Sequence, residues 1–442
     1  MSKMKTFSPS PKKPFNIWGF LVLILIHGAF GIALKSNSSL GNIHAYAVFG
    51  IGVIISIMCK NKLPIIYVVA YILTSEVLWR TVFTEIFWES GKYFISALMI
   101  IGLFRFWDGK SLKSLIILYF LLLIPSIFSM EFLDRQAISF NLSGPFTLMI
   151  SVIFFSNVRI EKTVFLNLLA ISILPVITLA IYIIGKMMVY DQIVFGSSSN
   201  FQTSGDFGPN QVAVTLAFGS LVAFYMALME KSLFIKTLLV VITVWLLAQS
   251  GLTFSRSGVW LTSISIFITA GVLIIIGKNR SSFLLLTLAT LLLIIFAVLP
   301  YLNTLTENTI SARFADLEPT GRMQIIQADM IAFQQNLFFG VGPSGSQQFH
   351  ALTFRVSNSH TEYSRLLAEH GLLGAGSLLI LFTVMISIVI RKTSWFNKAY
   401  TIGLMVWAAL FMTVSGMRLA LPSVLIGLSF AQFSLDEEKE SK

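Results

Sequence analysis

The stretch "VFLNLLAISILPVITLAIYIIG", residues 164–185, decides the fold because it contains no charged side chain from one end to the other. About 20 apolar residues in a helix span the hydrocarbon core of a bilayer, where no water can bind the backbone groups. Comparable runs recur along the whole chain of 442 residues, which is 56% hydrophobic and only 12% charged. Ordinary globular domains carry about 25% charged residues, so the composition excludes a soluble fold.

We therefore expect an all-α, polytopic integral membrane bundle of 12–14 transmembrane helices. Twelve apolar runs are strong candidates for spans: Phe15–Leu34, Ile43–Met58, Leu63–Trp79, Leu115–Met130, Val164–Gly185, Val212–Leu228, Leu233–Ala248, Gly258–Gly277, Ser282–Leu302, Gly371–Ile390, Ala399–Val414 and Leu419–Phe433. Two shorter runs, Tyr93–Phe104 and Gly144–Phe155, raise the count to fourteen. The basic N-terminus resembles a signal peptide, but no small-residue cleavage site follows the first apolar run, which predicts a retained first helix.

The net charge of +11 follows from membrane topology. With fourteen spans and a cytoplasmic N-terminus, 20 of the 31 Lys and Arg residues fall in the cytoplasm and 11 outside. Every short inner loop is basic, as the positive-inside rule requires, and both termini are predicted to be cytoplasmic. No nucleic-acid partner is needed to explain the charge.

The outer basic residues are mostly arginines, whereas the inner ones are mostly lysines. Eight of the 11 outer residues are Arg: Arg80, Arg135, Arg256, Arg313, Arg322, Arg355, Arg365 and Arg418. The guanidinium fork matches the oxygens of a phosphate or carboxylate, so the asymmetry indicates an anionic ligand on the outer face. The alternative is that each Arg packs at a crowded interface and pairs with an outer carboxylate such as Glu85 or Glu131.

One predicted outer loop, Tyr301–His370, is far longer than most other connections, and long structured loops are usually functional. Within it, Met323, Ile326, Met330, Phe333 and Leu337 recur every three or four residues, which predicts an amphipathic helix that ends at Gly340. This helix is expected to lie on the membrane surface or to cap the bundle. The glycines that follow, in "GVGPSG", could let the backbone approach a ligand, but a simple turn is the preferred interpretation.

The loop ends in "SHTEYSRLLAEHGLLG", in which Ser359 and Glu362 have the spacing of a capping box. His360 would then lie in the first helical turn, where the helix dipole disfavours imidazolium and keeps a neutral base available. A histidine at a helix start can also be purely structural. Arg365 and Glu369, four residues apart, are expected to form a surface pair.

Metal chemistry finds little support in the sequence. Cys59 is the single cysteine, and His27, His44, His350, His360 and His370 show no ligand spacing. Among the predicted outer carboxylates, Asp316 and Glu318 form the only close pair, with no histidine beside them. We predict an activity that needs neither a metal nor another cofactor.

Four segments, in this order, resemble the O-antigen ligase and O-antigen polymerase superfamily of bacterial envelope glycan enzymes. They are "FGPNQVAVTLAFG", "FSRSGVWLT", "GRMQIIQADMIAFQQNLFFGVGPSG" and "SNSHTEYSRLLAEHGLLG", and together they cover roughly Gly208 to Gly374. The resemblance divides the chain into N-terminal transmembrane helices, residues 1–207, and a ligase-like region, residues 208–442. The second part contains the periplasmic loop 301–370 and the last three transmembrane helices.

The resemblance implies transfer of a glycan from an undecaprenyl-diphosphate carrier to an acceptor sugar, without a metal, at the periplasmic face of the bacterial inner membrane. By the motif match, Arg256 and Arg322 look like the family's functional arginines that bind the diphosphate, and His360 looks like its catalytic histidine. Two guanidinium groups suit a leaving diphosphate, a neutral imidazole suits removal of the acceptor proton, and direct displacement would invert the anomeric centre. The chain reads His-Thr at 360 and 361, where the commoner form has His-Asn.

The resemblance leaves the acceptor open. A ligase transfers to a lipid A core sugar, and a polymerase of O-antigen or exopolysaccharide transfers to a lipid-linked glycan. A lipid or solute transporter is the alternative from another class, but such proteins usually carry ionisable groups deep in their helices, where this sequence offers mainly His27 and Glu76. An inactive envelope scaffold would leave the arginines and the long loop unexplained.

Overall fold

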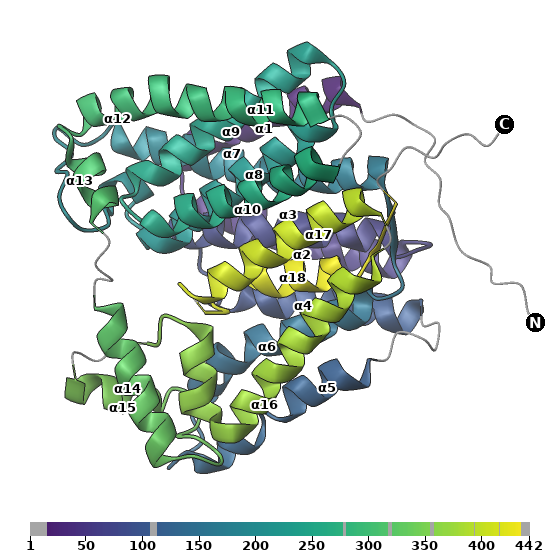
Figure 1. Ribbon diagram of the computed structural model, residues 1–442, viewed down its shortest axis with the longest axis vertical. Helices are drawn as coiled ribbons and strands as arrows, with labels where there is room; N and C mark the ends of the chain where they lie inside the picture. Colours follow the sequence, from purple (N-terminus) through teal and green to yellow (C-terminus); the bar gives the residue numbers. More distant parts are fainter. Residues whose placement is uncertain are drawn as a thin grey trace, which may run out of the picture.

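The computed structural model describes residues 16–106, 113–276, 280–316, 321–353, 358–392, 394–414 and 416–434. The described chain is almost entirely helical, with one pair of three-residue strands, so the predicted all-α membrane fold is confirmed (Figure 1). Arg355 and Glu318, named above, lie outside the described residues.

The elements of the N-terminal half are mostly long apolar helices. They are α1 (Ile17–Ser36), α2 (Ser39–Met58), α3 (Leu63–Thr81), α4 (Ser90–Arg105), α5 (Ser114–Leu121), η1 (Pro125–Ser129), α6 (Arg135–Phe155), β1 (Arg159–Glu161), α7 (Lys162–Met187), η2 (Gln202–Ser204), α8 (Pro209–Met229) and α9 (Leu233–Leu252). The C-terminal half alternates long helices with short ones. They are α10 (Arg256–Ile276), α11 (Arg280–Leu293), η3 (Ile294–Val298), α12 (Leu299–Leu305), α13 (Thr309–Ala315), α14 (Arg322–Gln335), α15 (Ser346–Thr353), α16 (Glu362–Arg391), α17 (Trp395–Met412), α18 (Ala420–Ser429) and β2 (Gln432–Ser434).

Every apolar run named in the sequence corresponds to a helix of the structure. Among the described residues, ten helices are long and apolar enough to cross a membrane: α1, α2, α3, α6, α7, α8, α9, α10, the continuous helix Arg280–Leu305, and α16. The short run Gly144–Phe155 is the second half of α6, which therefore reaches full spanning length. The remaining predicted runs correspond to α4, to α5 with η1, to α17 and to α18, which do not meet these criteria.

Helix α8 forms the centre of the bundle and is buried along its spanning stretch. It is apolar on all sides, as a helix surrounded by other helices must be. Gly258 lets α10 approach closely, because a Cβ atom there would lie 2.5 Å from the carbonyl oxygen of Ala213 on α8. The hydroxyl of Thr262 on α10 donates to the carbonyl oxygen of Ala217, 2.9 Å away, and ties the same two helices together.

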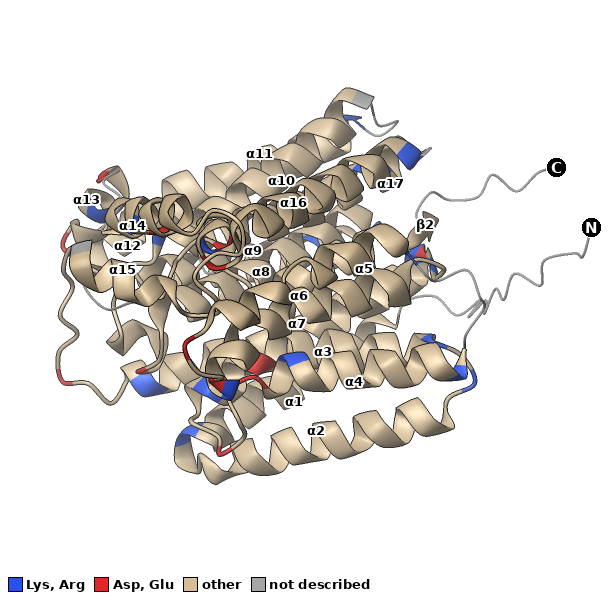
Figure 2. Cartoon of the chain, turned by 90° about the horizontal axis from the view of Figure 1, so that it is seen from below, with Lys and Arg blue, Asp and Glu red and all other residues tan. Residues whose placement is uncertain are grey.

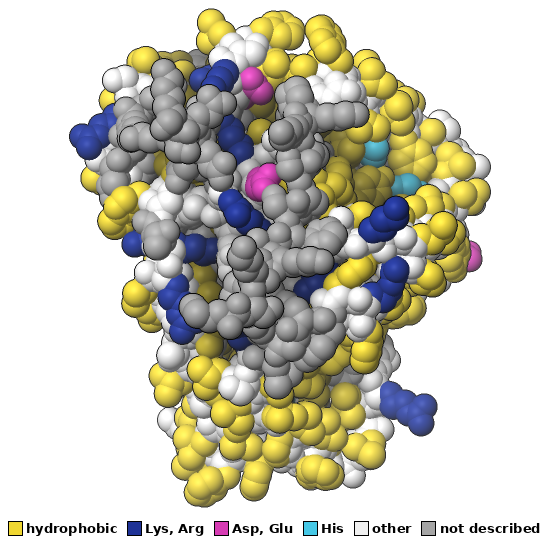
Figure 3. Space-filling model, turned by 90° about the vertical axis from the view of Figure 1, so that its right-hand side faces the viewer, with side chains coloured by type: hydrophobic (Ala, Val, Ile, Leu, Met, Phe, Trp, Pro, Cys, Tyr) yellow, Lys and Arg dark blue, Asp and Glu magenta, His cyan; other side chains and the backbone are white. Residues whose placement is uncertain are grey.

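Charged side chains gather toward the two ends of the long helices (Figure 2). At one end, Arg105 donates to the carbonyl oxygen of Ser56, Lys62 donates to that of Phe154, and the parallel strands β1 and β2 pair. The face at this end shows many more basic than acidic side chains (Figure 3). Three of the loops predicted to be cytoplasmic, which carry Lys62, Arg105 and Arg159, thus lie together near β2, and the long loop lies at the opposite end (Figure 1).

The predicted outer loop contains α13, α14, α15 and the first turns of α16. Helix α16 bends at Gly371, whose φ of +60° and ψ of −140° are not helical. A Cβ atom at Gly371 would lie 2.5 Å from the carbonyl oxygen of Leu337, so glycine is required where the turn after α14 packs on α16. The bend separates the first segment of the helix, Glu362–His370, from the long apolar segment that follows.

The amphipathic helix exists, but two details of its prediction are wrong. It ends at Gln335, before a turn that leads to Gly340, and its buried residues are Ile325, Ala328, Asp329 and Ala332. The predicted apolar stripe is only partly covered, and Met323 is 49% exposed. A buried aspartate with hydrogen-bond partners occupies the inner face, so apolar periodicity alone identifies the wrong face.

Candidate functional site

The turn "FSRSG", residues 254–258, brings the starts of three helices together at the end of the bundle that carries the long loop. Phe254 has a φ of +58°, which turns the chain sharply before α10. The Ser255 hydroxyl donates to the side-chain oxygen of Asn210 at the start of α8, at 2.7 Å. The Ser257 hydroxyl accepts a hydrogen bond from the Arg322 guanidinium at the start of α14, at 3.4 Å. The first three segments quoted from the sequence therefore meet at one place.

Three arginines surround this turn. Arg256 is the first residue of α10, Arg322 is the first residue of α14, and Arg313 on α13 donates to the carbonyl oxygen of Phe254 at 3.2 Å. Burial, together with repulsion from Arg256, lowers the pKa of both Arg313 and Arg322. Asp316, 3.7 Å from Arg313, is the acidic group that offsets part of this charge.

The charge arrangement at the turn favours an anion. The positive end of a helix dipole attracts negative groups, yet both α10 and α14 begin with a guanidinium. An anion bound between them would relieve the repulsion that lowers the arginine pKa values and would accept fork-like hydrogen bonds. Helix starts of this kind are typical of phosphate sites.

Asp329, two turns along α14 from Arg322, anchors the fourth segment. Its carboxylate is fully buried and accepts three hydrogen bonds: from His350 at 2.7 Å, from Ser359 at 2.8 Å and from Ser364 at 2.6 Å. His360 follows Ser359 directly and is half-buried. The structure thus holds Ser359, the neighbour of His360, at the middle of α14, and Asp329 lies about 10 Å along the helix axis from Arg322.

The predicted capping box at Ser359 is wrong. The N-cap of α16 is Thr361, whose hydroxyl accepts from the backbone N–H of Ser364 at 3.0 Å, and His360 precedes the helix. Ser359 is unavailable as a cap because its hydroxyl binds Asp329. Both residues carry a hydroxyl, so the sequence alone cannot distinguish the cap from the anchor. The dipole argument for a neutral imidazole in the first turn therefore does not apply as stated.

The interpretation of Arg365 and Glu369 as a surface pair is also wrong. Arg365 is 7% exposed and binds Glu369 at 2.7 Å, Glu362 through a second ion pair, and the side-chain oxygen of Asn141 at 3.2 Å. Two carboxylates therefore share one guanidinium between α16 and α6. The spacing of four residues on a helix predicts that Arg365 and Glu369 pair. Nothing in the neighbouring sequence indicates that the pair is buried.

A second set of buried charges holds the loop between α17 and α18. Lys92 donates to the carbonyl oxygen of Met417 at 3.2 Å, and the backbone N–H of Met417 donates to Glu362 at 3.0 Å. The next residue, Arg418, donates to the carbonyl oxygen of Ser359 at 2.9 Å. Burial and repulsion from Arg365 lower the pKa of Arg418 to about 10. The sequence shows Arg418 only as one of the outer arginines. The structure places it in contact with Ser359, the neighbour of His360.

Replacing Arg365 with alanine is expected to destabilise the protein by about 3–5 kcal/mol, because Glu362 and Glu369 would stay buried without their cation. The apparent melting temperature in detergent measures this loss. Arg135→Ala is the matched control, since Arg135 is exposed at the start of α6. Equal melting temperatures for the two variants would contradict the structural role given to Arg365.

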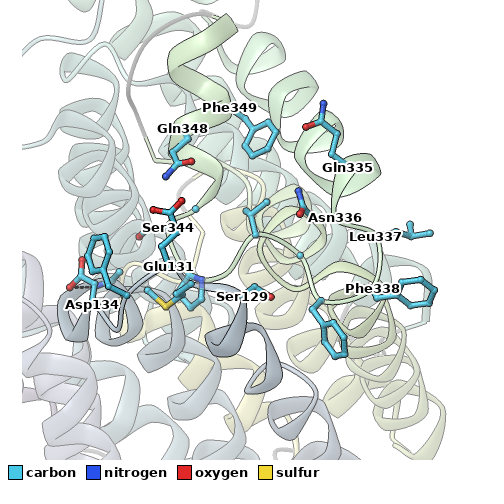
Figure 4. Close-up of a pocket in the computed structure, with 18 residues that line it drawn as sticks. Ser129, Glu131, Asp134, Gln335, Asn336, Leu337, Phe338, Ser344, Gln348 and Phe349 are labelled. Carbon is cyan, nitrogen blue, oxygen red and sulfur yellow. Dashed lines mark hydrogen bonds between the residues drawn. The ribbon is translucent and has the colours of Figure 1, made fainter.

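An open cavity of about 650 Å³ lies beside the ion-pair cluster of Arg365, Glu362 and Glu369, between the loop before α6 and the turn after α14. Glu131, Asp134, Ser344 and Gln348 stand on one side of it, and Leu337 and Phe338 on the other (Figure 4). Arg256, Arg322 and His360 do not line it. The structure therefore separates an arginine site from an acidic cavity at the same end of the bundle.

Metal ligands do not converge in the part of the chain that the structure describes: it holds no group of three His, Cys, Asp or Glu side chains placed to share an ion. Asp316 lies beside Arg313, and its sequence partner Glu318 is outside the described residues. Metal independence stays a prediction.

Comparison with known families gives one match. Residues 238–379, about a third of the chain, match the family model described as O-antigen ligase. The segment includes Arg256, Arg322 and His360, and the match confirms the resemblance to the O-antigen ligase superfamily. No curated protein matches the chain.

Proposed function

Since residues 238–379 resemble the O-antigen ligases, we propose that the protein transfers a glycan from an undecaprenyl-diphosphate carrier to an acceptor sugar at the periplasmic face of the inner membrane. One observation carries the proposal: two helices that both begin with arginine, α10 and α14, meet at their positive ends. Such a site suits a diphosphate because it offers charge and forked donors together.

The donor step breaks the bond between the anomeric carbon and the diphosphate oxygen. The bonding electrons leave with the carrier diphosphate, and Arg256 and Arg322 stabilise the negative charge that develops on it. Arg313 adds to the same positive field from the buried side of the turn. The arginines neutralise the leaving oxygen, so no general acid is required.

The acceptor step forms a bond between the acceptor hydroxyl oxygen and the same carbon. The hydroxyl proton passes to the His360 imidazole, which acts as the general base. Asp329 and Arg418 act as positioning residues, because both hold Ser359, the neighbour of His360. Attack opposite the leaving diphosphate inverts the anomeric configuration.

The same donor chemistry serves a ligase and a polymerase, and we propose the ligase-like reaction. Product size separates the two. Loss of a ligase leaves bare lipid A core while carrier-linked chains accumulate, whereas loss of a polymerase leaves single repeats on the surface lipid.

The purified protein is expected to transfer glycan from its lipid-diphosphate donor in the presence of a chelator, because the arginines replace a metal at the diphosphate. The assay follows glycolipid product on gels. Activity that disappears in chelator and returns with magnesium would contradict this mechanism.

The long loop, residues 301–370, is expected to face the periplasm. A membrane-impermeant maleimide should then label the variant Gln334→Cys in intact cells, with Cys59→Ser as the background that removes the native cysteine. Labelling that appears only after lysis would contradict this placement.

A further inference from the structure

Helix α14 and its C-terminal cap hold three features in order along the helix axis. Arg322 and Asp329 are seven residues apart, about two helical turns, so they point in similar directions, and Asn336, seven residues further on, caps the end of the helix. Arg322 belongs to the arginine site, Asp329 holds Ser359 beside His360, and Asn336 lines the open cavity. Successive features are about 10 Å apart along the helix axis. Ser359, the neighbour of the proposed base, therefore lies between the proposed diphosphate site and the cavity along the helix axis.

The lining of the cavity suits a ligand rich in hydroxyl groups. Glu131 and Asp134 supply carboxylates, Gln335 and Gln348 supply amides, and no Lys or Arg stands among the described residues that line it. Carboxylates accept hydrogen bonds, and amides both donate and accept them, as sugar hydroxyls need. The two acids repel a phosphate, so this cavity does not suit the diphosphate.

Aromatic rings complete the surface. Phe338 and Phe339, 68% and 55% exposed, line the cavity together with Phe132. The electron-rich face of a phenyl ring can stack on the C–H face of a sugar. The volume of about 650 Å³ lies within the range of about 300–1,000 Å³ that small-molecule sites occupy.

The wall beside the ion-pair cluster is fixed in place. The backbone N–H groups of Val341 and Gly342 donate to carbonyl oxygens of α16, each at 3.0 Å. The backbone N–H of Ser344 donates to the Glu369 carboxylate at 3.0 Å, and its hydroxyl accepts from Asn141 at 2.7 Å. These contacts link the cavity to Arg365 and onward to the loop that holds His360.

We infer that this cavity binds the acceptor glycan, at sugars next to the one whose hydroxyl reacts. The inference rests on the proposed function, because His360 fixes where the acceptor hydroxyl lies. Along α14 the cavity lies beyond Ser359 as seen from the arginines, so a chain whose terminal sugar reaches His360 would extend toward the cavity. A neutral or amino-bearing glycan is the class of ligand that its lining selects.

The test uses acceptor fragments of defined length. Acid-released fragments of the cell's own surface glycolipid, one or four sugars long and sharing the reactive terminal sugar, serve as acceptors for the purified full-length protein. The ratio of kcat/KM for the long fragment to that for the short one is expected to fall about 2- to 10-fold in Gln335→Ala and in Gln348→Ala, the effect of one lost hydrogen bond. Gln334→Ala is the control, since Gln334 is exposed but does not line the cavity.

An unchanged ratio in both cavity variants, with wild-type transfer intact, would overturn the cavity assignment and leave the proposed function standing. Absence of any transfer by the wild type would overturn the proposed function instead. Saturation-transfer NMR with the four-sugar fragment then decides on the cavity by itself. Sugar signals that weaken in Gln335→Ala and Gln348→Ala but not in Gln334→Ala support the assignment, and equal signals in all three variants overturn it.

Discussion

Replacing Arg322 with alanine is expected to lower the rate of glycan transfer about 100- to 1,000-fold, the range observed when a donor to a developing negative charge is removed. Arg322 begins α14 and reaches Ser257 at the start of α10, so its loss removes one of the two guanidinium groups placed at converging helix ends. Initial rates of transfer by purified protein measure the effect.

Two companion variants separate charge from geometry. Arg322→Lys keeps the positive charge but loses the forked donors, so its rate should fall between wild type and Arg322→Ala. Arg135→Ala, an exposed arginine of α6, should transfer at the wild-type rate. Wild-type activity in Arg322→Ala would show that the diphosphate binds elsewhere.

Replacing His360 with alanine is expected to lower the transfer rate about 100- to 10,000-fold, the usual contribution of a general base. The wild-type rate should also fall as the pH is lowered, because imidazolium cannot accept a proton. That dependence should disappear from the residual activity of the variant. Initial rates across a pH series, with wild type and His360→Ala side by side, measure both effects.

The control for His360 is a histidine of the same loop with a structural role. His350→Gln keeps a side chain that can donate to Asp329, and it should retain most of the transfer activity. If His360→Ala were as active as wild type at every pH, His360 would not be the base.

The membrane bundle could be predicted from the sequence because each spanning helix carries its own signal, a run of apolar residues that avoids water. Val164–Gly185 contains no charge. In the hydrocarbon core no water can bind the backbone groups, so this segment must form a helix that satisfies them internally. The side of the membrane on which each basic loop lies stays a prediction. The division of the chain at residues 207 and 208 stays a prediction.

The candidate site was only partly readable. Motif order identified Arg256 and Arg322, and the structure brings their helices together through Ser257. Arg418 and Asn141 gave no local signal, because their roles depend on partners far away in the sequence.

Buried polar groups caused the errors. Asp329 lies on the buried face of α14, away from the expected apolar stripe, because three donors satisfy its carboxylate. Arg365 is buried because two glutamates accompany it. An analysis of sequence periodicity that assumes every charged residue to be exposed to solvent cannot predict either buried group.

The most direct test of the proposed division of roles is the dissociation constant of the lipid-diphosphate donor, measured for wild type, Arg322→Ala and His360→Ala without acceptor. Loss of charge-assisted hydrogen bonds should weaken binding about 10- to 100-fold in Arg322→Ala. His360→Ala should bind the donor as tightly as wild type, because it acts on the acceptor. Unchanged binding in Arg322→Ala would contradict the account.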